Sequence, residues 1–268
     1  MKTYIPYQQI VNKLQINKNE TLLIASDITK LAYTTLTNGE IFNADLFVDS
    51  FKNKLTEGTL LFPAFNDKLM SGDKFDKKNT IPQTGTLSKL VFKRKDFSRT
   101  ADPLHSFFVF GKFADELLKI NNKSTFGDDS VFAFLNEHRA LMLLIDIDIQ
   151  HSFTFAHYVE EKENVKYRKY KKININYTDD GKAQKREVLT FAKKNGIVST
   201  LNNLHKLFID NGAMNIYKIN DSTFSMIRLD KAYELIQEDI KMNNAENLYS
   251  FDLINFIKSS IKQFIPFK

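Results

Sequence analysis

The first candidate for chemistry in this chain is the pair His157 and Glu160, which stand three positions apart. On a helix, this spacing places both side chains on one face. A carboxylate beside an imidazole fixes the tautomer of the ring and supports the imidazolium that forms when the ring accepts a proton. The pair therefore indicates a general base, and a solvated pair on a helix surface is the competing interpretation.

A second polar cluster spans residues 100–106, directly before an apolar run, and contains Asp102, His105 and Ser106. Polar side chains at a strand edge of an α/β protein often face a ligand crevice. An Asp-Pro dipeptide followed by a serine is equally typical of a turn. Both interpretations stay open from the residues alone.

The dipeptide Ser26-Asp27 follows the first apolar run of the chain. It could cap a helix, or its backbone amides could hold a phosphate or a thioester. The chain contains no Gly-x-Gly-x-x-Gly motif and no Walker loop. Dinucleotide and P-loop chemistry are therefore not expected.

Residues 162–172 form a basic stretch interleaved with tyrosines and include Lys166 and Arg168. Cations with aromatic rings suit nucleic acid, and they suit the phosphates of one nucleotide equally well. An exposed basic strand or loop is the alternative. Because the stretch is short and has glutamates beside it, we expect no nucleic-acid partner.

The chain has 268 residues and no cysteine, which excludes a disulfide framework, an iron–sulfur centre and a thiolate nucleophile. No two of its five histidines stand four positions apart, so we expect no metal. Its 38 Lys and Arg against 32 Asp and Glu give a net charge of +6, which is compatible with a phosphate-bearing partner. Without a long apolar segment or a signal peptide, we expect a cytoplasmic protein with no membrane span.

Apolar runs alternate with helical patterns in the first half of the chain. The predicted strands are 21–25, 59–62, 107–110 and 140–145, and the predicted helices are 46–55, 87–91, 113–118 and 131–135, the last capped by Asp128 or Asp129. Continuous apolar strands are expected where both faces of a sheet are covered. This pattern predicts an α/β fold with a central, mostly parallel sheet and helices on both faces.

The second half of the chain has a different pattern. It predicts a strand at 173–177 with a turn at 179–182, a hairpin of 214–219 and 223–227, and helices at 229–242 and 250–262. We expect this antiparallel part to share the core, which makes 1–268 a single domain. A subdivision into 1–161 and 162–268 is the alternative.

Taken in order, these segments resemble the aminoglycoside 3-N-acetyltransferase family over roughly residues 5–230. The matching segments are 22–28, 58–65, 84–87, 99–106 and 153–160. The most telling match is 99–106, which resembles the family's Arg-Ser-x-His-Pro-x-His-Ser segment, with Asp102 at the first histidine. Segment 153–160 resembles Asn-Thr-x-x-His-x-x-Glu. The family's Gly-Val-Gly after the fourth strand is replaced here by 147–149.

The resemblance implies an acyltransferase that moves an acetyl group from acetyl-CoA to a primary amine of an amino sugar. It implies that His157 is the catalytic base and that Glu160 orients it. The residues that it implies for the acyl-CoA tunnel and the thioester are Ser26, Asp27, Gly85, His105, Ser106 and Thr154. A homodimer stays open.

The net basic charge favours an acceptor with phosphate groups, such as a nucleotide-linked amino sugar of surface-polysaccharide synthesis. Asp102, Lys166 and Arg168 are then the predicted contacts to the acceptor or to its phosphates. One alternative is acetylation of an aminoglycoside antibiotic, which gives resistance. Another is a non-catalytic module that binds CoA or a sugar, suggested by the missing glycines and by Asp102.

Overall fold

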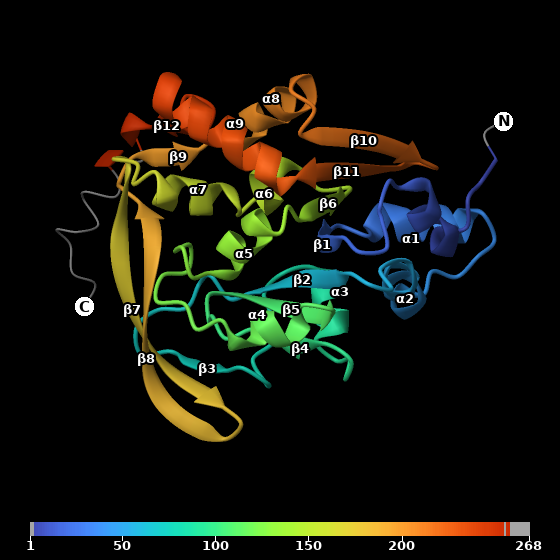
Figure 1. Ribbon diagram of the computed structural model, residues 1–268, viewed down its shortest axis with the longest axis horizontal. Coiled ribbons are helices and arrows are strands. Elements are labelled where there is room, and N and C mark those ends of the chain that lie inside the picture. The colour runs from blue at the N-terminus through green and yellow to red at the C-terminus, as the bar shows by residue number, and fades with distance from the viewer. Residues whose placement is uncertain (1–2, 255, 258–268) are drawn as a thin grey trace.

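The centre of the protein is a seven-stranded sheet, shown by a computed structural model that describes residues 3–254 and 256–257 (Figure 1). Its strands lie in the order β10-β11-β6-β1-β2-β5-β4. Their bounds are β1 Thr21–Ser26, β2 Thr59–Phe65, β4 Ser98–Arg99, β5 His105–Gly111, β6 Leu141–Ile145, β10 Met214–Ile219 and β11 Ser222–Arg228. The strand predicted at each apolar run is present.

The sheet is parallel in its middle and antiparallel on both sides. Strand β1 runs parallel to β2 and to β6, so Leu23 pairs with Leu61 on one side and Met142 on the other. The four outer pairings are antiparallel. The predicted α/β class is confirmed, and the sheet is mixed because β5 returns beside β2 and β11 returns beside β6.

Helices cover both faces of this sheet, as predicted. Their bounds are η1 Tyr7–Lys13, α1 Thr29–Thr37, α2 Ala44–Lys54, α3 Thr86–Val91, α4 Ala114–Lys119, α5 Val131–Glu137, α6 Ile149–Ser152, α7 Ala156–Lys162, η2 Leu201–Asn203, α8 Leu204–Asp210 and α9 Leu229–Met242. Alternate residues of β1 enter two cores: Leu23 packs with α5, α7, α8 and α9, and Leu22 packs with η1, α1, α2 and α3. The first core contains residues of both halves of the chain.

A long two-stranded ribbon projects away from the central sheet (Figure 1). It pairs β7, Arg168–Asp179, with β8, Lys182–Lys193, and β3, Lys74–Asp76, lies alongside β7. Asp180 and Gly181 form the turn, both with positive φ. The basic stretch 162–172 therefore ends in a strand whose lysines are exposed, and Arg168 is a buried exception.

Two local predictions are corrected by the structure. Helix α5 is capped by Ser130, whose Oγ accepts from the Ala133 amide at 3.3 Å, rather than by Asp128 or Asp129. The helix predicted at 250–262 begins later than expected, because β12, Tyr249–Phe251, pairs with β9, Ile197–Ser199, whereas residues 253–254 and 256–257 are helical. Residues 255 and 258–262 of that prediction lie outside the described residues. In the described part of the chain, no helix has the length and apolar character needed to cross a membrane.

Candidate active site

Helix α7 holds His157 and Glu160 on one face, as their spacing predicted. The Nδ1 atom of His157 lies 2.6 Å from Oε2 of Glu160. The Glu160 side chain is 1% exposed and that of His157 is 21% exposed. The carboxylate therefore lies inside the protein, while the ring reaches the surface of the site.

Two successive residues at the start of the ribbon also contact Glu160. The hydroxyl of Tyr167 donates to Oε1 at 2.8 Å, and Nε of Arg168 lies 2.7 Å from Oε2. The Arg168 side chain is 5% exposed, its Nη1 donates to the carbonyl of Phe191 at 2.9 Å, and its Nη2 lies 2.9 Å from Nδ1 of His157. Arg168 is thus an internal ion-pair partner of Glu160, and not the free phosphate contact that the basic stretch suggested.

The charges around His157 keep its ring neutral. Burial lowers the pKa of His157, the positive charge of Arg168 lowers it further, and Glu160 opposes both. Burial by itself would raise the pKa of Glu160, but His157, Arg168 and Tyr167 together hold that pKa below its usual value. The pair is therefore a neutral imidazole beside an ionised carboxylate.

A second histidine lies near the first across an aromatic ring. His105, at the start of β5, and His157 both contact Phe126, with ring centroids 5.1 and 5.5 Å away. Phe65 and Phe132 complete the aromatic surroundings of His105. Burial lowers the pKa of His105 to about 4, and its Nδ1 has no hydrogen-bond partner among the residues the structure describes.

Asp102 and Ser106 have structural partners. Asp102 is buried, and its Oδ1 accepts from the amides of Leu104 and His105 at 2.7 and 2.9 Å while its Oδ2 accepts from Asn122 at 2.6 Å. These contacts correspond to the turn interpretation. The Asp102 carboxylate stabilises the turn and is not a contact to the substrate that accepts the acetyl group. The Oγ of Ser106 accepts from Arg99 at 2.8 Å and donates to a backbone carbonyl, in a fully buried position.

Three other predicted positions lie at the ends of β1 and β2. Ser26 ends β1, and a Cβ on Gly85 would come within 3.1 Å of the Ser26 carbonyl. Thr154 is half-buried beside a cavity of ≈10 Å³ that Phe65, Phe132 and Met142 also line. The backbone of Gly85 therefore lies next to Ser26, and Thr154 lies next to an apolar cavity.

Asp27 and Lys166 are exposed and lie less centrally. Oδ1 of Asp27 accepts from the Thr29 amide at 2.9 Å, although the N-cap of α1 is Ile28 and has no side-chain cap. Lys166 is exposed in the turn before the ribbon. Sequence reasoning missed Phe126 and Tyr167 as site residues. The only available signal for Tyr167 was its place in the basic stretch, and Phe126 had none.

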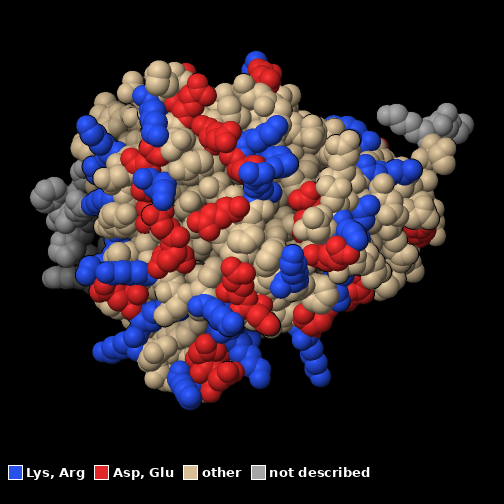
Figure 2. Space-filling view, in the orientation of Figure 1, with Lys and Arg blue, Asp and Glu red and all other residues tan. Residues whose placement is uncertain are grey.

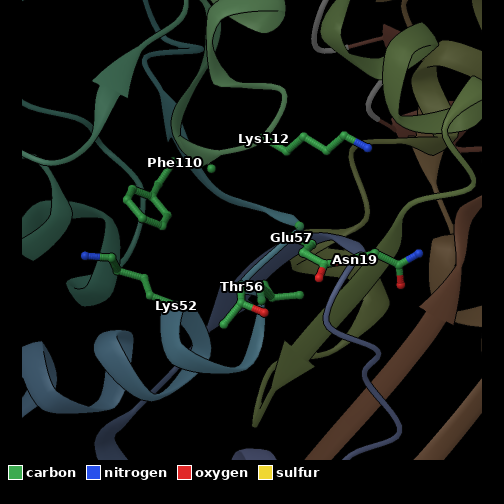
Figure 3. A pocket seen from close by; sticks show the side chains of 9 residues that line it. Asn19, Lys52, Thr56, Glu57, Phe110 and Lys112 are labelled. Atoms are coloured by element: carbon green, nitrogen blue, oxygen red, sulfur yellow. The ribbon is translucent and has the colours of Figure 1, made fainter.

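A separate pocket of ≈580 Å³ lies at the other end of the same strands (Figure 3). Lys52, Thr56, Glu57, Phe110 and Lys112 are among the residues that line it. Phe110 is near the end of β5, whereas His105 is at its start. This pocket is therefore remote from the His157–Glu160 pair. Among the described residues, no group of three or more His, Asp or Glu side chains could hold a metal ion.

An imidazole that lies against a buried carboxylate has the geometry of a general base. The family model for aminoglycoside 3-N-acetyltransferase matches residues 37–241, which is more than half of the chain. The chain therefore belongs to this family of acetyltransferases, which use acetyl-CoA as the acetyl donor. A comparison with curated protein sequences finds no match.

Solved structures share the fold over most of the chain. The YokD protein from Bacillus subtilis has a TM-score of 0.74 at 18% identity, covering 92% of this chain and 97% of that one. AAC-IIIb, solved in a binary complex with CoASH, has a TM-score of 0.76 at 14% identity, covering 94% and 99%. A mutant of AAC(3)-IVa, solved in complex with a gentamicin, has a TM-score of 0.69 at 16% identity, covering 91% of both chains.

Proposed function

We propose that this enzyme transfers the acetyl group of acetyl-CoA to a primary amine of an aminoglycoside-type amino sugar. The observation that carries the proposal is the 2.6 Å contact between His157 and the buried carboxylate of Glu160. The family supplies the acetyl-transfer chemistry, and this contact supplies the proton acceptor that the chemistry needs.

His157 acts as the general base in this proposal. A sugar amine is protonated in neutral solution and must lose a proton to become a nucleophile. Because a carboxylate only accepts, Nδ1 of His157 carries the proton that faces Glu160, and Nε2 keeps a free lone pair. Glu160 stabilises the imidazolium that forms when Nε2 takes the proton of the amine.

The ends of β1 and β2 fit the acetyl donor. When bound, acetyl-CoA supplies a thioester whose thiolate is the leaving group. Gly85, at the start of α3, lies against the end of β1, where a Cβ would come within 3.1 Å of the Ser26 carbonyl. Ser26 and the half-buried Thr154 offer hydroxyl donors at this edge of the sheet.

The charge beside the base supports a cationic acceptor. Glu161 follows Glu160 on α7, is 7% exposed, and its Oε2 has no hydrogen-bond partner among the described residues. Burial raises the pKa of Glu161, the hydroxyls of Ser124 and Tyr170 partly offset that rise, and the charges of Asp128 and Asp129 add to it. A buried carboxylate of this kind gains from a nearby ammonium. Arg168 is already paired with Glu160 and is not free to bind a phosphate. This weakens the hypothesis of a phosphate-bearing acceptor.

The test measures thiol release from acetyl-CoA with a panel of amines. One arm contains gentamicin-type aminoglycosides and the other contains nucleotide-linked amino sugars. We expect turnover in the first arm, and we expect His157→Ala to lower kcat/KM by about 10²–10⁴-fold, the usual effect of removing a general base.

Lys169→Met is the control, because Lys169 is an exposed residue of β7 outside the site. Turnover in the second arm alone would replace the aminoglycoside by a nucleotide-linked acceptor. Saturable binding of acetyl-CoA with no turnover in either arm would favour a non-catalytic module and reject the proposal.

A further inference from the structure

Arg168 touches both members of the pair on α7, although it stands on another element. As the first residue of β7, it places its Nε 2.7 Å from Oε2 of Glu160 and its Nη2 2.9 Å from Nδ1 of His157. Its third nitrogen, Nη1, donates to the carbonyl of Phe191 on β8. The guanidinium is therefore anchored by the Nη1 hydrogen bond and by its ion pair with Glu160, in which Nε has no aligned hydrogen bond, and 5% of its side chain is exposed.

We propose that Arg168 is a positioning residue that holds the Glu160 carboxylate against His157 and so keeps Nε2 of the imidazole toward the acceptor. A planar fork suits this task, because one guanidinium can bind a carboxylate and a backbone carbonyl in fixed directions. The role in acetyl transfer rests on the function proposed above. The geometric role does not depend on it.

The geometry also decides between two tautomers of His157. A carboxylate oxygen 2.6 Å from Nδ1 requires a proton on Nδ1, whereas a guanidinium nitrogen only donates and would need Nδ1 bare. The contact with Glu160 is the shorter of the two and joins Nδ1 to a full negative charge. We therefore infer that Nδ1 is protonated, and that Arg168 acts on the ring through Glu160 and through its charge.

Several charged groups face His157 from the elements packed around it. Glu160 lies on the same helix, Arg168 on β7, Lys193 on β8, and His105 on β5 interacts with it across Phe126. Among the cations, Arg168 touches the pair, whereas Lys193 is exposed and has no hydrogen bond to it among the described contacts. Comparing Arg168 with Lys193 therefore distinguishes the effect of a direct contact on His157 from the effect of a nearby positive charge alone.

The test is an NMR titration of the protein labelled with ¹⁵N-histidine, with His157 identified by the signal that disappears in His157→Gln. We expect Arg168→Met to raise the pKa of His157 by about one unit, because the variant removes a positive charge that lies 2.9 Å from the ring. The matched control Lys193→Met removes a positive charge of similar size and should shift the pKa much less. In the unchanged protein, the neutral ring should be protonated on Nδ1.

Arg168→Lys settles the matter if Arg168→Met fails to fold. Lysine keeps the charge and loses the fork. The pKa of His157 should then stay close to its original value while the neutral ring becomes a mixture of tautomers, and kcat should fall with KM little changed. Unaltered tautomers in Arg168→Lys, equal shifts from Lys193→Met and Arg168→Met, or an Nε2-protonated ring in the unchanged protein would each overturn the proposal.

This titration needs neither acetyl-CoA nor an acceptor. If no amine is acetylated while the pKa and tautomer of His157 respond as expected, the proposed function fails and the positioning role stands. If amines are acetylated and the titration shows no response, only the role of Arg168 fails.

Discussion

His105 and His157 show how strongly partners decide the behaviour of one side-chain type. Both contact Phe126, but His157 has Glu160 on its Nδ1, whereas the buried Nδ1 of His105 has no hydrogen-bond partner among the described residues. Burial lowers the pKa of His105 to about 4. The unfolded chain, with a histidine pKa of about 6.5, therefore binds more protons than the folded one between these values. Stability must rise with pH across that window.

The first prediction follows from this difference. Between pH 7 and pH 5, His105 should lower the free energy of unfolding by about 2 kcal/mol, since one pKa unit corresponds to about 1.4 kcal/mol. Urea unfolding at the two pH values measures it. His105→Phe, which suits the aromatic surroundings, should lose most of this contribution. An equal pH dependence in both proteins would contradict the assignment.

The second prediction concerns the base itself. Because the pKa of His157 is lowered, its neutral form persists below pH 6.5, so the enzyme-dependent acid limb of kcat/KM should lie below that value. The measurement is kcat/KM for acetyl transfer between pH 5 and pH 8, with two acceptors whose amines differ in pKa. A limb common to both acceptors belongs to the enzyme. A common limb centred at or above pH 6.5 would be inconsistent with a neutral, buried base.

For single residues, the sequence predicted the contact between His157 and Glu160 but not the contact of Arg168 with Glu160. The spacing of His157 and Glu160 predicted a shared helix face because helical geometry is local. The partnership of Arg168 with Glu160 was not predictable, because it depends on where the ribbon begins relative to α7. The Asp102 turn was available from Asp-Pro, but only the structure chose it over a ligand contact.

Among the elements, the antiparallel return of β5 beside β2 depends on close backbone contact at one end. Gly111 has φ +106°, and a Cβ there would lie 2.3 Å from the carbonyl oxygen of Gly58. Gly39 has a similar φ of +83° with nothing within 4 Å of such a Cβ. The two glycines share a conformational requirement, and only Gly111 has a steric one as well.

The third prediction compares them. Gly39→Ala should destabilise the protein by about 1 kcal/mol, the cost of a left-handed conformation for alanine. Gly111→Ala should cost at least about 2 kcal/mol more, because backbone atoms must move apart. Thermal or urea unfolding of both variants tests this. Equal losses of stability in the two variants would show that the backbone at the β2–β5 junction can move apart at little cost.

Element prediction succeeded where apolar residues cluster locally and failed where they do not. Strands β1, β2, β5 and β6 are buried on both faces, so their sequences are continuously apolar. Strand β8 was missed because its first half, 182–187, is polar and largely exposed. The order of strands in the sheet was beyond the sequence, since pairing joins segments far apart in the chain.

Over the whole molecule, the net charge of +6 proved a poor guide to the site. Figure 2 shows basic and acidic side chains interspersed over the visible face, without one sign dominating. Beside the base, by contrast, the buried groups are Glu160, Glu161 and the already paired Arg168. The net charge adds up all charges of the protein and mainly affects its solubility. A ligand responds to the charges within about 10 Å of its own site.

The fourth prediction uses this local charge. For a polycationic acceptor, KM should rise several-fold between 50 and 500 mM KCl with kcat little changed, because salt screens the attraction. Glu161→Gln should raise KM at low salt and reduce this dependence. Steady-state kinetics at both salt concentrations tests it, with Glu187→Gln, a glutamate of the distant ribbon, as the control. A salt-independent KM would argue against a cationic acceptor.

The Asp102 carboxylate has a consequence for protein engineering. It joins the turn before β5 to Asn122, in the segment that also carries Phe126 between the two histidines. Restoring the family's histidine by Asp102→His alone would remove an acceptor from two backbone amides and from the Asn122 amide, all in a buried place. Asp102 therefore cannot be replaced by histidine on its own. A successful replacement would have to change residue 122 at the same time.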